Sequence, residues 1–212
     1  MTSICMNIQS SIFSRHTLAL LLAIFALSLG SLGCNTQSGL TVTSVDRQQT
    51  FRQCFTQAYS SRNANGDTDV VLIDQATEQG LAGKAIDSPV LQVMHLRLLW
   101  SPTREMKAVT SNASVKWYVI GRSVPPGLLE YDGIAFVSST TDDDATVLKV
   151  RNSTLTLSTK HGNMVDWIGT SKLEGTFTAR ENREIVEKVL RQLNATVAAA
   201  NNAPGGISSI AP

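Results

Sequence analysis

The sequence predicts an α+β fold in which a mainly antiparallel β-sandwich or curled sheet carries one helix at each end. Three observations support this prediction. Short stretches of alternating apolar and polar residues follow one another between residues 63 and 180. No helical pattern separates these stretches, so neighbouring strands should pair antiparallel. Patterns with the helical period of 3.6 residues flank the region on both sides.

The first helix is predicted over Val45–Ser60. Its apolar residues recur at helical spacing, at Phe51, Cys54, Phe55, Ala58 and Tyr59. Ser44 is placed as the N-cap and Asp46 in the first turn, where an acidic side chain is favourable. On this stripe Cys54 is expected to be a buried, unreactive thiol.

About six or seven strands are predicted between loops that contain Gly, Pro and Asp. The clearest segments are 70–73, 90–100, 113–122, 128–138 with a break at 132–133, 146–159 and 172–180. Residues 75–89 are ambiguous and can hold a helical turn. Met94, Leu96, Leu98 and Trp100 are predicted to share one side of their strand, and the inner face of the next strand is predicted to be Val115, Trp117 and Val119.

The second helix is predicted over 183–199, with Asn182 as its N-cap. Its buried stripe consists of Ile185, Val186, Val189, Leu190, Leu193 and Val197. Residues 201–212 are rich in Gly, Pro and Ser and are predicted to be a disordered tail.

The first 33 residues have the layout of an export signal. Arg15 and His16 precede an apolar run, Thr17–Leu32, whose 16 residues are too few to span a bilayer core. A spanning helix needs about 20 residues. Small residues follow the run, as they do in secretory signals that are cleaved.

The run ends in GSLGCN at residues 30–35. Residues 1–35 thereby resemble bacterial lipoprotein precursors, whose signals end in small residues and a cysteine. The resemblance implies cleavage after Gly33, a diacylglyceryl thioether on Cys34 and a fatty acyl chain such as palmitate on the new amino group. It implies a protein of the cell envelope that faces the periplasm or the exterior. Asn35, in place of an aspartate, favours the outer membrane. Ser31 departs from the family, which most often has Leu there.

Removal of the signal leaves 212 − 33 = 179 residues, a suitable size for one domain. We assign 34–43 to a tether and 44–200 to a single β-rich domain. Because Arg15 leaves with the signal, 17 basic side chains remain against 17 acidic ones. This balance argues against nucleic acid as a partner. Cys54 is the one cysteine within the domain, and a single thiol makes neither a disulfide nor a structural zinc site.

Two strands carry the candidate ligand-binding residues. His95 and Arg97 share one side of their strand, and Lys116, Tyr118 and Arg122 share one side of the next. Antiparallel pairing would bring them together as a basic patch with one aromatic ring. Such a patch can hold an anionic sugar, phosphate or carboxylate. The alternative is a solvated sheet face, or a face covered by a helix.

No catalytic residue, metal-ligand set or cofactor is assigned, because the sequence has neither GxSxG nor HExxH. The loops at 63–69 and 142–144 offer Asx oxygens but no complete calcium motif. The favoured hypothesis is a non-catalytic envelope lipoprotein that binds another envelope protein or glycan, or supports an assembly. A small envelope hydrolase and an anion- or solute-binding domain remain as alternatives. Membrane lipid attached through Cys34 is the expected partner in every case.

Overall fold

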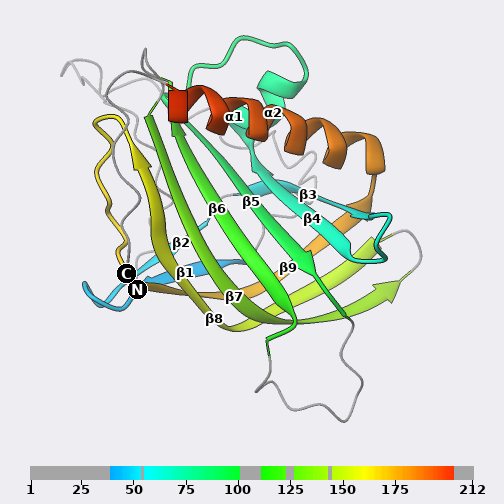
Figure 1. The fold of residues 1–212 in the computed structure, drawn as a ribbon. Helices are drawn as coiled ribbons and strands as arrows, with labels where there is room; N and C mark the ends of the chain where they lie inside the picture. Colours follow the sequence, from blue (N-terminus) through cyan, green and yellow to red (C-terminus); the bar gives the residue numbers. More distant parts are fainter. Residues whose placement is uncertain (1–38, 54, 101–110, 123–126, 143–144, 203–212) are drawn as a thin grey trace, which may run out of the picture.

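The computed structural model describes residues 39–53, 55–100, 111–122, 127–142 and 145–202, and these residues form a closed β-barrel (Figure 1). Seven strands close the barrel, and two extra strands and two helices are attached to it. The strands are β1 (Thr41–Ser44), β2 (Gln49–Arg52), β3 (Phe55–Arg62), β4 (Thr68–Asp74), β5 (Val90–Leu98), β6 (Ala113–Gly121), β7 (Gly127–Asp142), β8 (Ala145–His161) and β9 (Ser171–Glu181). The helices are α1 (Gln75–Leu81) and α2 (Arg183–Asn202).

Strand β9 closes the barrel. The order around it is β9-β3-β4-β5-β6-β7-β8, and β8 pairs back to β9. All of these pairings are antiparallel except β3–β9, which is parallel at Tyr59↔Arg180 and Ser60↔Glu181. The mainly antiparallel β-structure is thus confirmed, and it takes the form of a barrel.

The predicted N-terminal helix is wrong: Val45–Ser60 contains a turn, β2 and most of β3. A β-bulge explains the misleading pattern. The β3–β4 register shifts between Phe55 and Gln57, so one extra residue lies on β3 there. Phe55 and Ala58, three positions apart, therefore both pack in the barrel core. Cys54 lies outside the described residues, so its expected burial stays a prediction.

The strand predictions are otherwise close to the structure. β7 continues through the predicted break at 132–133 but bends, with register shifts between Glu130 and Tyr131 and between Ile134 and Phe136. β1 begins at Thr41, inside the stretch assigned to the tether, and Leu40 and Val42 are fully buried. The ordered sheet therefore starts soon after Cys34.

Apolar side chains fill the barrel interior. Alternate residues of β4 to β9 point inward, as the predicted inner face required. The buried residues include Met94, Leu96, Leu98, Val115 and Trp117, and Val119 is partly buried beside them. The ring centroids of Trp117 and Tyr131 lie 5.4 Å apart. This interior is the main core of the domain.

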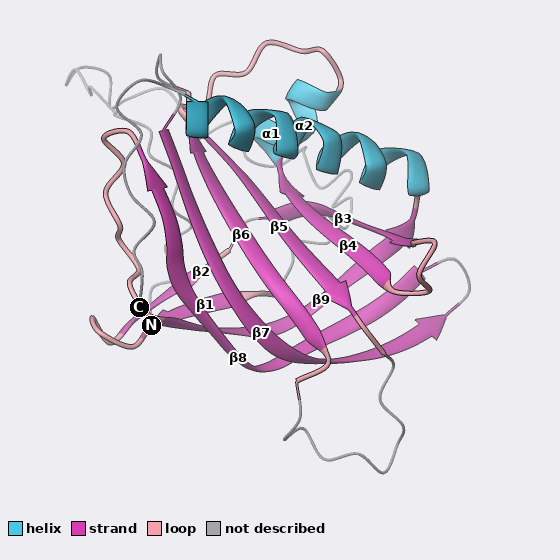
Figure 2. Ribbon diagram, in the orientation of Figure 1, coloured by secondary structure: helices cyan, strands magenta, loops and turns pink. Residues whose placement is uncertain are grey.

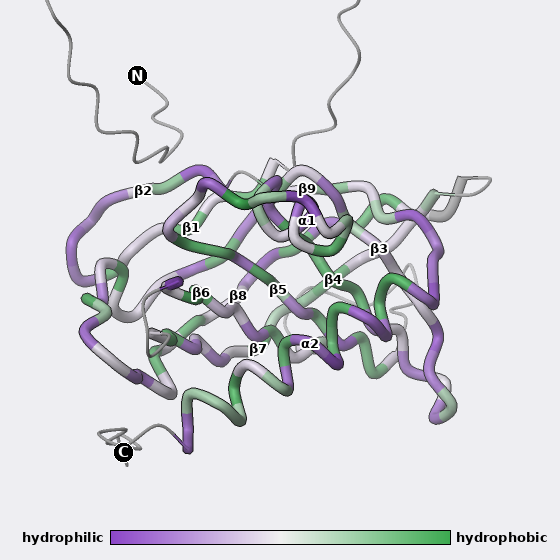
Figure 3. Tube along the Cα trace, turned by 90° about the horizontal axis from the view of Figure 1, so that it is seen from above, coloured by the Kyte–Doolittle hydropathy of each residue, from purple (hydrophilic) through white to green (hydrophobic). Residues whose placement is uncertain are grey.

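Helix α2 confirms the predicted C-terminal helix and packs on the outside of the barrel (Figure 2). Asn182 caps it, because its Oδ1 accepts the backbone N–H of Ile185 at 3.0 Å. The buried face of α2 contacts outward side chains of β4 to β7, in a second cluster of Val71, Ile73, Val93, Tyr118, Ile120, Leu128, Val186, Val189, Leu193 and Ala200. From above, α2 lies along one side of the molecule, and β1 and β2 lie on the opposite side (Figure 3).

The short helix α1 lies between β4 and β5. Asp74 caps it by accepting the Thr77 N–H at 2.7 Å, and its other oxygen accepts the Gln92 N–H at 2.9 Å. Neither described helix is long and apolar enough to cross a membrane.

Candidate functional site

The outer face of β4 to β7 is divided into an apolar half under α2 and a charged half. The β5–β6 register places His95 opposite Lys116, and Arg97 opposite Ser114. The two strands therefore bring three of the five predicted binding residues together. The charged half also contains three carboxylates that the sequence reasoning missed. We call the group the wall cluster, and it consists of Asp69, His95, Arg97, Lys116, Glu130 and Asp132.

Asp69 on β4 is the shared acceptor at one side of the wall cluster. Its Oδ1 lies 2.8 Å from His95 Nε2 and 3.0 Å from Arg97 Nε. Its Oδ2 accepts the Asn63 Nδ2–H at 3.0 Å. An ionised carboxylate only accepts hydrogen bonds, so we infer that the imidazole proton lies on His95 Nε2.

Burial and hydrogen bonding have opposite effects on the pKa values of Asp69 and His95. Burial by itself raises the pKa of Asp69, but hydrogen bonds from His95, Arg97 and Asn63 outweigh it and hold the pKa below its ordinary value. Burial lowers the pKa of His95, and Asp69 offsets this only in part. The favoured state is therefore a neutral His95 beside a charged Asp69.

Lys116 forms the other side of the wall cluster. Its Nζ lies 2.7 Å from Glu130 Oε1 and 3.4 Å from Asp132 Oδ1, both on β7. Although burial opposes its charge, these acidic neighbours raise the pKa of Lys116. The lysine is therefore held as a cation between two carboxylates.

Tyr118 and Arg122 form none of the ion pairs of the wall cluster, but Tyr118 lies beside them, opposite Glu130 in the β6–β7 register. Tyr118 is buried in the cluster under α2, and burial followed by the charge of Glu130 raises its pKa to about 12. Arg122 donates to the backbone carbonyls of Ile86 and Ser88, which fixes the connection before β5. Tyr118 is therefore held by packing under α2, and Arg122 by hydrogen bonds to the backbone.

The wall cluster has three carboxylates against two permanent cations, so it has no excess of positive charge. Period-2 alternation could have placed Glu130 and Asp132 on one face of β7. The pairing of β4 with β5, which brings Asp69 in, could not be derived from a local pattern. Anion binding by the five residues stays a prediction.

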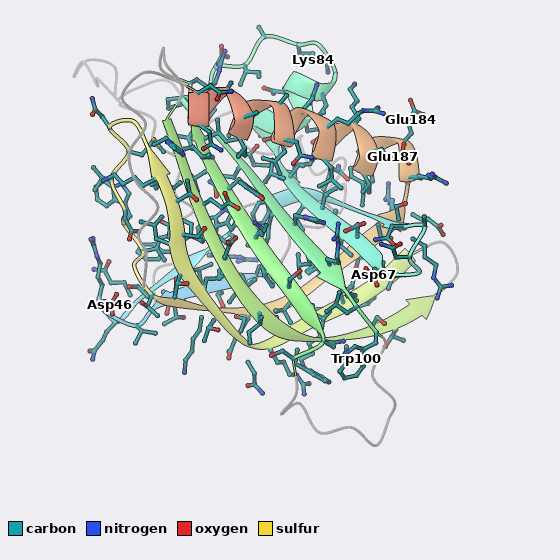
Figure 4. All side chains as sticks on the ribbon, viewed as in Figure 1. Asp46, Asp67, Lys84, Trp100, Glu184 and Glu187 are labelled. Carbon is teal, nitrogen blue, oxygen red and sulfur yellow. The ribbon has the colours of Figure 1, made fainter. Side chains whose placement is uncertain are left out.

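The loop before β4 uses its oxygens internally. Asn63 Oδ1 accepts the backbone N–H groups of Asn65 and Asp67 at 3.0 and 3.1 Å, as in an Asx turn. Figure 4 labels Asp67 at this turn. Among the described residues, no group of three or more His, Cys, Asp or Glu side chains could hold a metal ion. Asp143 and Asp144 lie outside the described residues.

A shallow hollow of about 430 Å³ lies beside β1, β8 and β9. Its lining includes Lys149, Arg151 and Glu174, so it contains charges of both signs. Asn152, also in the lining, adopts a positive φ of 48° next to a register shift in β8. The hollow is open and mixed in charge, and it indicates no particular ligand.

The loop at residues 162–170 closes one end of the barrel core. Met164 lies against Gly121 and Gly127, where a Cβ atom would come within 2.8 and 2.5 Å of the methionine side chain. Ile168 is buried in the barrel core. Tyr131 donates its hydroxyl to Asp166 Oδ1 at 2.6 Å, which fastens the loop to β7.

Asp166 holds the loop in shape. Its Oδ1 also accepts the backbone N–H groups of Ile168 and Gly169, each at 3.0 Å. Burial by itself raises the pKa of Asp166, but the hydrogen bonds hold it below its ordinary value. Burial and then the hydrogen bond to Asp166 raise the pKa of Tyr131.

No protein-family model, curated protein or solved structure matches this chain.

Proposed function

We propose that this protein is an envelope lipoprotein, held to a membrane by lipid on Cys34, and that its barrel is a non-catalytic binding or assembly module. The observation that carries the proposal is the position of the cysteine. It follows an apolar run and small residues, and the sheet begins only a few residues later, with Leu40 and Val42 fully buried. A folded domain that starts so soon after an acylated cysteine stays close to the bilayer.

The non-catalytic part of the proposal is supported by how the polar groups are used. The charged side chains of the wall cluster form ion pairs with one another, and Asp74, Arg122 and Asp166 bond to backbone groups. The barrel interior is occupied by apolar side chains. A module of this kind acts through its outer surface and its loops, with another envelope protein or a glycan as its partner.

The attachment is tested with Cys34→Ser. In a bacterial host, the wild-type precursor should lose residues 1–33 and gain two or more acyl chains. Such chains give durable anchoring, at about 0.8 kcal/mol per buried methylene. Cys34→Ser should accumulate as an unlipidated precursor. Intact mass spectrometry of the membrane extract measures both results.

Cys5→Ser is the matched control, because it removes a cysteine that precedes the apolar run. Its lipidation should equal that of the wild type. A mature N-terminus other than a lipid-modified Cys34 would contradict the proposal.

A further inference from the structure

Two loops at one end of the barrel form a single surface. The β1–β2 turn, residues 45–48, meets the loop at residues 162–170. Val45 donates its backbone N–H to Thr170 O at 2.8 Å, and Thr170 donates its own to Asp46 Oδ2 at 3.1 Å. Arg47 Nη2 donates to Asp166 O at 3.2 Å. We call these two segments the end loops, and Asp46 marks them in Figure 4, on the opposite side of the view from Asp67.

The end loops expose apolar side chains. Val45, Val165 and Trp167 are 50%, 56% and 55% exposed. They are three of the six large apolar residues that are exposed in the described chain, so half of that group lies on two short segments. Single exposed apolar residues are normal, but a concentration of them indicates a surface that binds something.

The loop holds these side chains outward by fixing the residues between them. Asp166 bonds to Tyr131 and to the loop backbone, and Ile168 is buried in the core. Val165 and Trp167 alternate with these two anchors, so the loop exposes them without losing its own packing. The exposure of Val165 and Trp167 therefore follows from the way in which Asp166 and Ile168 anchor the loop.

The end loops combine a tryptophan with an exposed arginine, and they carry one positive charge against two negative ones. Asp46 and Asp166 both accept backbone N–H groups within the two segments, and Asp166 also accepts the Tyr131 hydroxyl of β7. Arg47 is exposed and carries a positive charge at the same place. Tryptophan favours the membrane–water boundary, since its ring is apolar and its N–H is polar. An arginine beside it can bind lipid phosphate.

The distance from Cys34 limits where the domain can be. Five residue steps separate Cys34 from Gly39, which span at most roughly 18 Å when fully extended. Gly39 is fixed to the barrel, because its N–H donates to Thr176 O at 2.9 Å. β1 then runs directly from this point to Val45. Val45 lies six residues beyond Gly39, roughly 20 Å along the strand, so the end loops reach the same bilayer when β1 lies along the membrane rather than perpendicular to it.

We propose that the end loops insert Val45, Val165 and Trp167 into the headgroup region of the bilayer that holds Cys34. The lipid anchor keeps the domain at the membrane, and the end loops fix its orientation there. This inference rests on the proposed lipid attachment.

The test uses the lipid-anchored protein in vesicles of phosphatidylcholine and phosphatidylglycerol, with and without brominated acyl chains. Bromine quenches tryptophan emission over a short range. Of the other two tryptophans, Trp117 is only 3% exposed, and Trp100 follows the end of β5, away from the end loops (Figure 4). We expect brominated vesicles to reduce the emission, and Trp167→Phe to abolish that reduction.

A second variant keeps the reporter and changes its neighbour. Val165→Asp should abolish the quenching while Trp167 is still present, since a charge opposes insertion. Val147→Asp is the matched control, because Val147 is exposed on β8, away from the end loops, and its substitution should leave the quenching unchanged. Thermal melting of all variants checks that the fold is kept.

The outcomes separate the two proposals. Lipid on Cys34 without quenching of Trp167 overturns the insertion of the end loops alone. Absence of lipid on Cys34 overturns the proposed function and this inference with it. A Trp167 emission that changes with protein concentration in the absence of vesicles would assign the surface to a second copy of the chain and would also overturn the inference.

Discussion

Asp69 links two side chains of β5 in the wall cluster, because His95 and Arg97 share one of its oxygens. In the fold, the lowered pKa of Asp69 gives stability that is present above its ordinary value of about 3.9 and is lost as the pH falls through the folded value. The lowered pKa of His95 affects the stability of the fold in a higher pH range than that of Asp69 does. Below about pH 6.5 the unfolded chain binds a proton that the folded His95 does not, so stability falls as the pH falls.

His95→Gln should remove the loss of stability at low pH that is due to the lowered pKa of His95. We expect the free energy of unfolding of the wild type to decrease from pH 7.5 to pH 5.5, and that of His95→Gln to decrease less over the same window. Urea unfolding at several pH values measures both. The control is Asn194→Ala, which changes an exposed side chain that does not titrate and should keep the wild-type slope. Equal slopes for wild type and His95→Gln would contradict a neutral, buried His95.

At the scale of elements, α2 and β3 show what a periodic pattern can predict. The apolar stripe of α2 continues over many turns with an N-cap before it, so both its type and its start could be predicted. In β3 a single bulge places Phe55 and Ala58 on one face at helical spacing. The pattern within residues 45–60 is compatible with both a helix and a bulged strand. The two could not be separated, because β4, whose pairing with β3 defines the bulge, lies further along the chain.

Asn182→Ala tests the cap of α2. Loss of the Asn182 side chain leaves the Ile185 N–H without its acceptor, and the free energy of unfolding should fall by about 1 kcal/mol. Urea unfolding followed by circular dichroism gives the value. Asn194→Ala, on the exposed side of the same helix, should change stability by less than about 0.5 kcal/mol. Equal effects of the two substitutions would mean that the cap does not stabilise the domain.

At the scale of the whole molecule, barrel closure depends on pairings between distant parts of the chain. β9 pairs with β1, β3 and β8, and Thr41 lies opposite Glu174. The same alternation of side chains is compatible with a sandwich, a curled sheet or a barrel, so the sequence predicts the strands and their inner faces but not the closure. The wall cluster was predicted only in part for the same reason, since Asp69 reaches His95 through the β4–β5 pairing.

Closure also requires that β7 and β8 approach closely where β7 bends. At Gly133 an added Cβ would lie 1.7 Å from the carbonyl oxygen of Thr154, a backbone atom that cannot move without disturbing the pairing. Gly133→Ala should therefore lower the free energy of unfolding by about 3 kcal/mol or more, because the added methyl group would overpack against the backbone. Gly80→Ala is the control, because its Cβ would meet only the flexible end of Ile86 and alanine favours the helix. Its stability should stay within about 1 kcal/mol of the wild type. Equal unfolding midpoints for the two variants in urea would show that β7 and β8 do not come together at Gly133, and the closed barrel would need revision.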